Sequence, residues 1–87
     1  MANLRLPTTL PLVFPGLPRE LELEATTVAD AIARLEERWP GLRDRLCESG
    51  PRLRRHINVY VDGSRADLDT ELEPRSRVDV VAAISGG

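Results

Sequence analysis

The segment from Thr27 to Trp39 carries the longest helical pattern in the chain and therefore constrains the fold most. Thr27 and Asp30 match a capping box, so we expect a helix to begin here, with the Thr27 hydroxyl accepting a hydrogen bond from the Asp30 amide. The apolar residues of the segment form one stripe at helical spacing: Val28, Ile32, Leu35 and Trp39. A helix with one apolar stripe must lie on another layer, which the remaining segments have to supply.

Those segments have the pattern of β-strands. Apolar and polar residues alternate in residues 2–6, 20–25 and 57–61, and residues 77–84 form a final, largely apolar strand. The pair Asp62-Gly63 is favoured in two-residue hairpin turns, which predicts that residues 64–66 pair back on the preceding strand. Because residues 77–84 are apolar on both faces, we expect this segment to be a central strand.

The segments between these elements are predicted to be connections. Residues 8–18 contain Pro11, Pro15, Gly16 and Pro18, so we expect a loop held to the core by its apolar side chains, Leu10, Leu12, Val13 and Phe14. Pro40-Gly41 ends the main helix, and Leu42 and Leu46 predict one further helical turn. Residues 52–56 are interpreted as a solvated loop that leads into the next strand.

The order strand, strand, helix, strand, short strand, strand predicts an α+β domain. One helix is expected to pack across a mixed sheet of four to five strands, which is the β-grasp, or ubiquitin-like, arrangement. We expect residues 1–84 to form this single domain and residues 85–87, Ser-Gly-Gly, to be a flexible C-terminal tail. The tail follows the last strand with no linker between them.

Composition excludes several function classes. The net charge is −2 and all twelve basic residues are arginine, so we expect no nucleic-acid partner and no lysine acceptor for isopeptide bonds on the chain itself. One cysteine, Cys47, allows no internal disulfide and indicates a cytoplasmic protein. The sequence has no apolar stretch that could span a membrane and no pattern of a signal peptide, so no membrane partner is expected.

Few side chains point to chemistry by themselves. Cys47 is interpreted as a packed cysteine, and the lone His56 has no partners for a metal site. The basic run around Arg54 and Arg55 fits either a solvated loop or a contact with an acidic partner or a phosphate. The glutamate row of residues 20–24 fits a solvated strand edge more often than a docking surface.

With the order of elements in place, the chain resembles the ubiquitin-like sulfur-carrier family, which includes the small subunit of molybdopterin synthase and the thiamine-pathway sulfur carrier. The resemblance covers essentially the whole chain. It rests on the helix of residues 27–39, Pro40-Gly41-Leu42-Arg43, the strand and turn of residues 57–63, Val78-Asp79-Val80, and the terminal Gly86-Gly87. The chain departs from the family pattern at Arg75-Ser76-Arg77, where Asp-Gly-Asp is common, and at Ala82, where proline is common, which leaves the pathway it serves open.

The resemblance implies a protein co-substrate that is not itself an enzyme. The Gly87 carboxylate would be adenylated with ATP and then converted to a thiocarboxylate, while Gly86 keeps the tail thin enough to enter a narrow channel. Ser85, Ile84, Arg54 and Arg55 are expected to contact partners, and no metal or cofactor is expected on this chain. ATP and a zinc site would belong to the partner enzyme.

The implied partners are an E1-like adenylating enzyme, a persulfide sulfur donor and a sulfur-accepting synthase, such as the molybdopterin synthase large subunit or a thiazole-type synthase. Two alternatives to a free carrier stay open. The chain could be a dedicated small subunit of molybdopterin synthase, or it could be a ubiquitin-like protein modifier.

Overall fold

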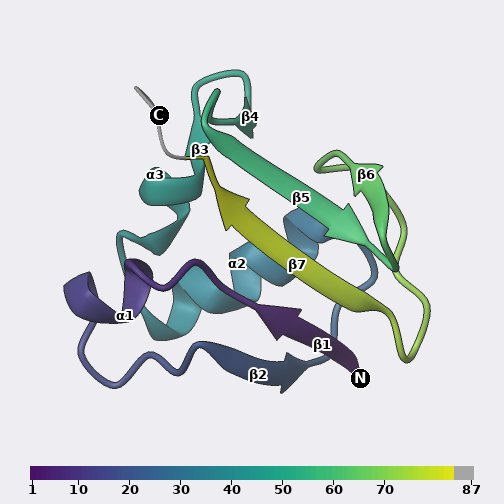
Figure 1. The fold of residues 1–87 in the computed structure, drawn as a ribbon, viewed down its shortest axis with the longest axis horizontal. Helices are drawn as coiled ribbons and strands as arrows, with labels where there is room; N and C mark the ends of the chain where they lie inside the picture. The colour runs from purple at the N-terminus through teal and green to yellow at the C-terminus, as the bar shows by residue number, and fades with distance from the viewer. Residues whose placement is uncertain (84–87) are drawn as a thin grey trace.

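The computed structural model describes residues 1–83 and consists of a sheet with a helix lying across one of its faces (Figure 1). In chain order the elements are β1 (Ala2–Arg5), α1 (Leu10–Val13), β2 (Glu20–Leu23), α2 (Val28–Arg38), α3 (Leu42–Leu46), β3 (Cys47–Glu48), β4 (Arg52–Leu53), β5 (Ile57–Val61), β6 (Ser64–Ala66) and β7 (Arg77–Ala82). No helix within residues 1–83 is both long and apolar enough to cross a bilayer.

The main sheet has five strands in the order β2-β1-β7-β5-β6. β1 runs parallel to β7, whereas the other neighbours are antiparallel, so the sheet is mixed and β7 lies at its centre. The turn between β5 and β6 has positive φ at both Asp62 (51°) and Gly63 (87°), as the sequence predicts for a two-residue hairpin. This arrangement confirms the predicted β-grasp fold.

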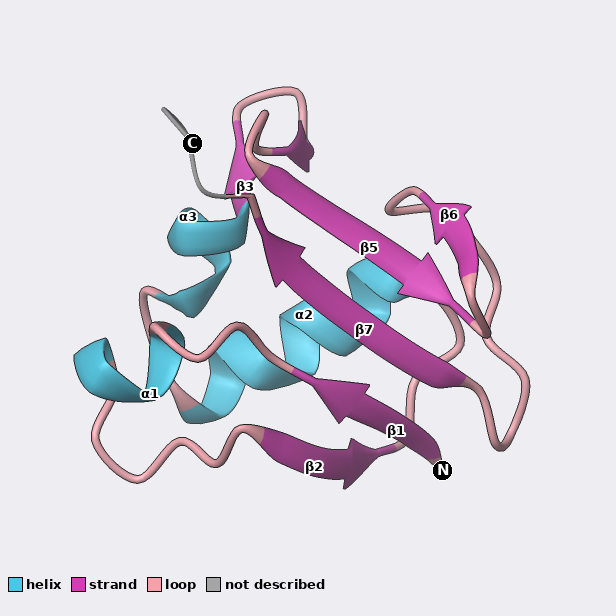
Figure 2. Ribbon diagram, in the orientation of Figure 1, coloured by secondary structure: helices cyan, strands magenta, loops and turns pink. Residues whose placement is uncertain are grey.

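Helix α2 covers one face of the sheet (Figure 2). The Asp30 amide donates to the side-chain oxygen of the N-cap residue Thr27 over 3.0 Å, as predicted, and the Asp30 carboxylate accepts from the amide of the preceding residue, Thr26, over 2.9 Å. The stripe of α2 is buried at Val28, Ile32 and Leu35. Trp39, predicted to be a core residue, is half-buried at the C-cap, and the Arg38 guanidinium lies 4.7 Å from its ring centroid.

The prediction of an irregular loop over residues 8–18 was wrong in part, because Leu10–Val13 form the short helix α1. Pro11 lies in the first turn of this helix, where a missing N–H costs no hydrogen bond, so it does not break the helix. Leu10 is buried and Phe14 packs against the core, as expected. Leu12 and Val13 are 84% and 44% exposed, so they do not hold the segment to the core.

The interpretation of residues 52–56 as a loop was wrong in part, because β4 pairs antiparallel with β3 in a second, two-stranded sheet. Strands of two residues are too short to show alternation in a sequence. The Arg54 amide also donates to the Leu46 carbonyl over 2.9 Å, which ties this sheet to α3. We call residues 42–56 the basic lobe.

Candidate functional site

The last described residues of the chain are held on one side. Pairing of β7 with β1 ends at Asp79, opposite Arg5, whereas pairing with β5 continues to Ala82. The Ala83 amide then donates to the His56 carbonyl over 2.7 Å. The backbone is therefore fixed up to Ala83, at the end of the sheet that carries the basic lobe (Figure 1).

Four predicted site residues lie outside the described residues: Ile84, Ser85, Gly86 and Gly87. Their roles as reacting carboxylate, thin tail and partner contacts stay predictions. What the structure adds is the surface from which this tail begins.

Part of that surface is the face of the sheet opposite α2, which we call the open face. Its outward residues near the end of β7 are Val81, which is 45% exposed, and Tyr60, which is half-buried. A groove of about 720 Å³ runs beside them and is bordered by Pro7, Thr8 and Ala83. The sequence correctly placed Val81 on a second apolar face of a central strand, but no layer covers that face among the described residues.

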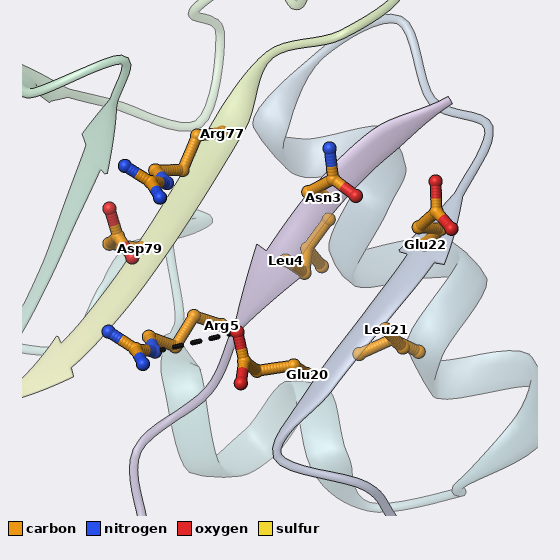
Figure 3. A pocket seen from close by; sticks show the side chains of 8 residues that line it. All are labelled: Asn3, Leu4, Arg5, Glu20, Leu21, Glu22, Arg77 and Asp79. Carbon is orange, nitrogen blue, oxygen red and sulfur yellow. Dashed lines mark ion pairs between the residues drawn. The ribbon is translucent and has the colours of Figure 1, made fainter.

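Further from the tail the open face is charged (Figure 3). Arg5 of β1 and Glu20 of β2 form an ion pair of 3.8 Å. Arg77 and Asp79, two residues apart on β7, both have their side chains on the open face. These side chains border a groove of about 340 Å³. Glu20 of the predicted glutamate row is thus paired, and the mixed charges of this region can make polar contacts with a partner of either sign.

Arg54 and Arg55 lie immediately before His56, next to the hydrogen bond that holds Ala83. The Arg54 side chain is half-buried, and its Nε donates to the Asp44 carbonyl over 2.7 Å, so part of its role is to brace the basic lobe. Arg55 is exposed. The structure therefore brings both predicted contact residues to the end of β7, while their contact with a partner stays a prediction.

Glu36 is a structural residue of the site that the sequence analysis missed. Its carboxylate accepts from the Gly41 amide over 3.0 Å and from the Arg43 amide over 2.8 Å, which joins α2 to the start of the basic lobe. These two hydrogen bonds lower the pKa of Glu36, the bond from Gly41 having the larger effect. Gly41 has a φ of 98°, a backbone conformation that favours glycine. The glycine that follows Pro40 was therefore the only feature of the sequence that pointed to this tight connection.

The remaining reactive groups form no cluster. Cys47 is buried, and burial raises the pKa of its thiol, so the thiol is protonated at neutral pH. His56 is exposed. Within residues 1–83, no three His, Cys, Asp or Glu side chains lie together in a way that could hold a metal ion.

The geometry can be compared with known proteins. The model of the ThiS family matches residues 12–87. A chain in the crystal structure of the Amycolatopsis orientalis BexX/CysO complex is 27% identical, covers 100% of both chains and superposes with a TM-score of 0.88. SAMP1 from Haloferax volcanii is 26% identical over 99% of this chain and 98% of its own, with a TM-score of 0.75.

Mycobacterium tuberculosis CysO has the same fold, with a TM-score of 0.84 over 97% of this chain and 100% of its own, at 22% identity. The comparison with curated proteins found no match. The matches cover the chain nearly from end to end, so the likeness concerns the whole domain rather than one motif.

Proposed function

Because the chain belongs to the ThiS family, we propose that it is a sulfur carrier whose C-terminal carboxylate, on Gly87, is adenylated by a partner enzyme and then converted to a thiocarboxylate. In the first step a carboxylate oxygen of Gly87 attacks the α-phosphate of ATP, and pyrophosphate leaves. In the second step the outer sulfur of a persulfide donor attacks the acyl carbon and AMP leaves, and a thiol then attacks the donor's inner sulfur, which releases the thiocarboxylate and leaves a disulfide on the donor. A carbon–sulfur bond replaces a carbon–oxygen bond, and the thiocarboxylate can then donate sulfur to an acceptor.

The hydrogen bond from Ala83 to His56 is the observation that carries this proposal. A substrate terminus must reach an active site in another protein while its domain stays folded. Since the backbone is held up to Ala83, residues 84–87 begin at a defined point on a rigid sheet. They can span at most about 14 Å, so the domain itself must dock close to the reacting nucleotide.

The two terminal glycines suit such an approach. Glycine has no Cβ, so a channel can close tightly around its backbone, and it adopts dihedrals that other residues cannot. A side chain at Gly86 would widen the tail directly beside the reacting carboxylate. We therefore expect Gly86→Ala to slow adenylation without any change in the stability of the domain.

The experiment is intact-mass spectrometry after incubation with ATP, a sulfide source and an adenylating enzyme from the same genome. The expected result is a mass increase that corresponds to replacement of one oxygen by one sulfur. A chain that lacks Gly87 is the control and should stay unchanged. Normal conversion of that control, or no conversion of the full chain by any adenylating enzyme of the genome, would contradict the proposal.

The acceptor is the finer part of the proposal. The BexX/CysO structure is of a complex, which supports docking of a carrier of this type on a partner protein. If this chain is a dedicated subunit of molybdopterin synthase, it should form a lasting complex with the large subunit, detectable by gel filtration. A free carrier should instead separate from its acceptor between steps.

A second candidate function is protein modification, which the likeness to SAMP1, a small archaeal modifier protein, favours. An activated Gly87 would then be attacked by a lysine amine of a target, with AMP as the leaving group. The chain itself contains no lysine, so it could end a conjugate but could not extend a lysine-linked one. Isopeptide adducts on targets, found by peptide mass spectrometry, would support this alternative.

A further inference from the structure

The charges of the chain are separated along the molecule. Residues 43–55, within the basic lobe, carry five arginines and two acidic side chains, a net charge of +3. The remaining seven arginines and twelve acidic side chains give the rest of the chain a net charge of −5. This protein is acidic as a whole but has one basic region, at residues 43–55.

That region lies where the described chain ends. Arg55 precedes His56, whose carbonyl accepts the hydrogen bond from Ala83. Consecutive Cα atoms are about 3.8 Å apart, and the Cα atoms of a hydrogen-bonded antiparallel pair, such as His56 and Ala83, are about 5.5 Å apart. The Cα atoms of Arg55 and Ala83 therefore lie within about 10 Å of each other. Any protein that receives the tail must come within about 14 Å of Ala83, so it must pass next to the basic lobe.

The basic lobe also forms one wall of a groove of about 600 Å³, whose other wall is β6 and the turn after it. Four arginines line this groove: Arg52, Arg54, Arg55 and Arg65. Its floor is the start of β5, where pairing with β6 reaches Val59 but not Ile57 or Asn58, and where the Ile57 amide donates to the Arg54 carbonyl over 2.9 Å. Three of these four arginines lie on the wall formed by the basic lobe.

The charges of the groove are only partly neutralised. Arg52 pairs with Glu48 over 2.8 Å, and Arg54 is bonded to a carbonyl, which leaves its charge uncompensated. Arg55 and Arg65 form no ion pair with any residue of the described part of the chain. Two carboxylates, Asp67 and Asp69, border the groove from the turn after β6, so the uncompensated positive charge is concentrated on the opposite wall, at Arg54 and Arg55.

We propose that this arginine groove binds an acidic segment of the adenylating enzyme and so positions the tail for reaction. The inference rests on the proposed function and names the surface and the chemistry of the partner. Complementary charge beside the reacting terminus raises the rate of encounter and fixes orientation, while the reaction itself still depends on the tail. The groove should therefore control the KM for the carrier and leave kcat unchanged.

The test compares two charge reversals in adenylation assays that follow pyrophosphate release. Arg55→Glu reverses a charge in the groove, and Arg75→Glu reverses an exposed charge in the turn before β7, at the opposite end of that strand. Both change the net charge equally. At low salt Arg55→Glu should raise the KM for the carrier about tenfold, Arg75→Glu less than about twofold, and kcat should not change.

High salt should reduce the difference between wild type and Arg55→Glu, because ions screen exposed charges. A titration of the wild-type chain with hexaglutamate, followed by amide chemical shifts, should move residues 52–58 and 65–69 first, and the same spectra confirm that each variant is folded. If the wild type is adenylated and the two variants have equal KM values, the groove does not bind the enzyme, although the proposed function still holds. A wild-type chain that is never adenylated would overturn both.

Discussion

The two faces of the sheet differ in what their side chains do. On the face covered by α2, the inward residues of β7, Val78 and Val80, are 1% and 5% exposed. On the open face, Val81 is 45% exposed although it is the next residue of the same strand. Because neighbouring residues of a strand point to opposite sides, one strand both holds the core together and presents a surface beside the tail.

Stability and recognition can therefore be changed separately in this domain. The covered face stabilises the fold through apolar burial, to which Leu42 and Leu46 of the basic lobe also contribute. Exposed side chains, such as Val81 on the open face and Arg55 of the basic lobe, contribute little to it. Substitutions on the two faces should accordingly differ in their effect on the free energy of unfolding.

Val80→Ala and Val81→Ala remove the same atoms from opposite faces. Val80→Ala should lower the free energy of unfolding by about 2 kcal/mol, because it removes buried methyl groups and leaves a cavity. Val81→Ala should change it by less than about 0.5 kcal/mol. Urea denaturation followed by circular dichroism measures both, and equal losses would show that something covers the open face.

Thr27→Ala tests whether the covering helix depends on its cap. The Thr27 hydroxyl accepts from the Asp30 amide, and loss of such a cap costs about 1 kcal/mol. Thermal denaturation should show the loss, and Thr27→Ser, which keeps the hydroxyl, is the matched control. If the serine and alanine variants are equally destabilised, the hydroxyl is not the stabilising group.

Glu36→Gln tests the link between α2 and the basic lobe through its pH dependence. The effect should be smaller than that of Thr27→Ala, because the amide oxygen of glutamine can still accept one hydrogen bond. The folded-state pKa of Glu36 lies below its ordinary value of 4.5, so its charge stabilises the fold above that pH. The contribution is lost as the pH falls through the lowered folded-state pKa.

Wild type should therefore be more stable than Glu36→Gln near neutral pH, and the two should converge in acid, where the wild-type side chain is also neutral. Urea denaturation at a series of pH values measures the difference. A difference that is independent of pH would mean that the lost interaction does not involve the charge.

Arg5→Gln should have the smallest effect on the free energy of unfolding. Its ion pair with Glu20 joins two exposed side chains across 3.8 Å on the open face. Exposed pairs of this kind contribute roughly 0 to 1 kcal/mol, and the distance and exposure favour the lower end. A loss as large as that of Val80→Ala would contradict the distinction between the two faces.

The elements that form the covered face could be predicted from the sequence, because burial against a common core requires apolar residues at regular spacing. The stripe of α2 and the alternation in β5 and β7 follow directly from contact with a common core. The failures lie where that constraint is absent: α1 contains prolines that usually mark loops, and β3 and β4 are too short to alternate. Exposure of Val81 could not be read from alternation, which separates two faces but does not say what covers each.

The candidate surface was only partly predictable for a similar reason. Arg54 and Arg55 stand out as a basic run, yet Arg65 joins them only after the two-residue turn at Asp62-Gly63 folds β6 back on β5. The link made by Glu36 depends on a positive φ at Gly41 and on hydrogen bonds between different elements. Long-range juxtapositions of this kind leave no periodic signal in a single sequence.

The parallel pairing of β1 with β7 also has a mechanical consequence. A force that pulls the tail away from the N-terminus acts at opposite ends of two adjacent parallel strands, so it loads their hydrogen bonds in shear. Bonds loaded in shear resist together, whereas bonds that are peeled break one after another. We therefore expect the domain to resist a force applied between its N-terminus and its tail.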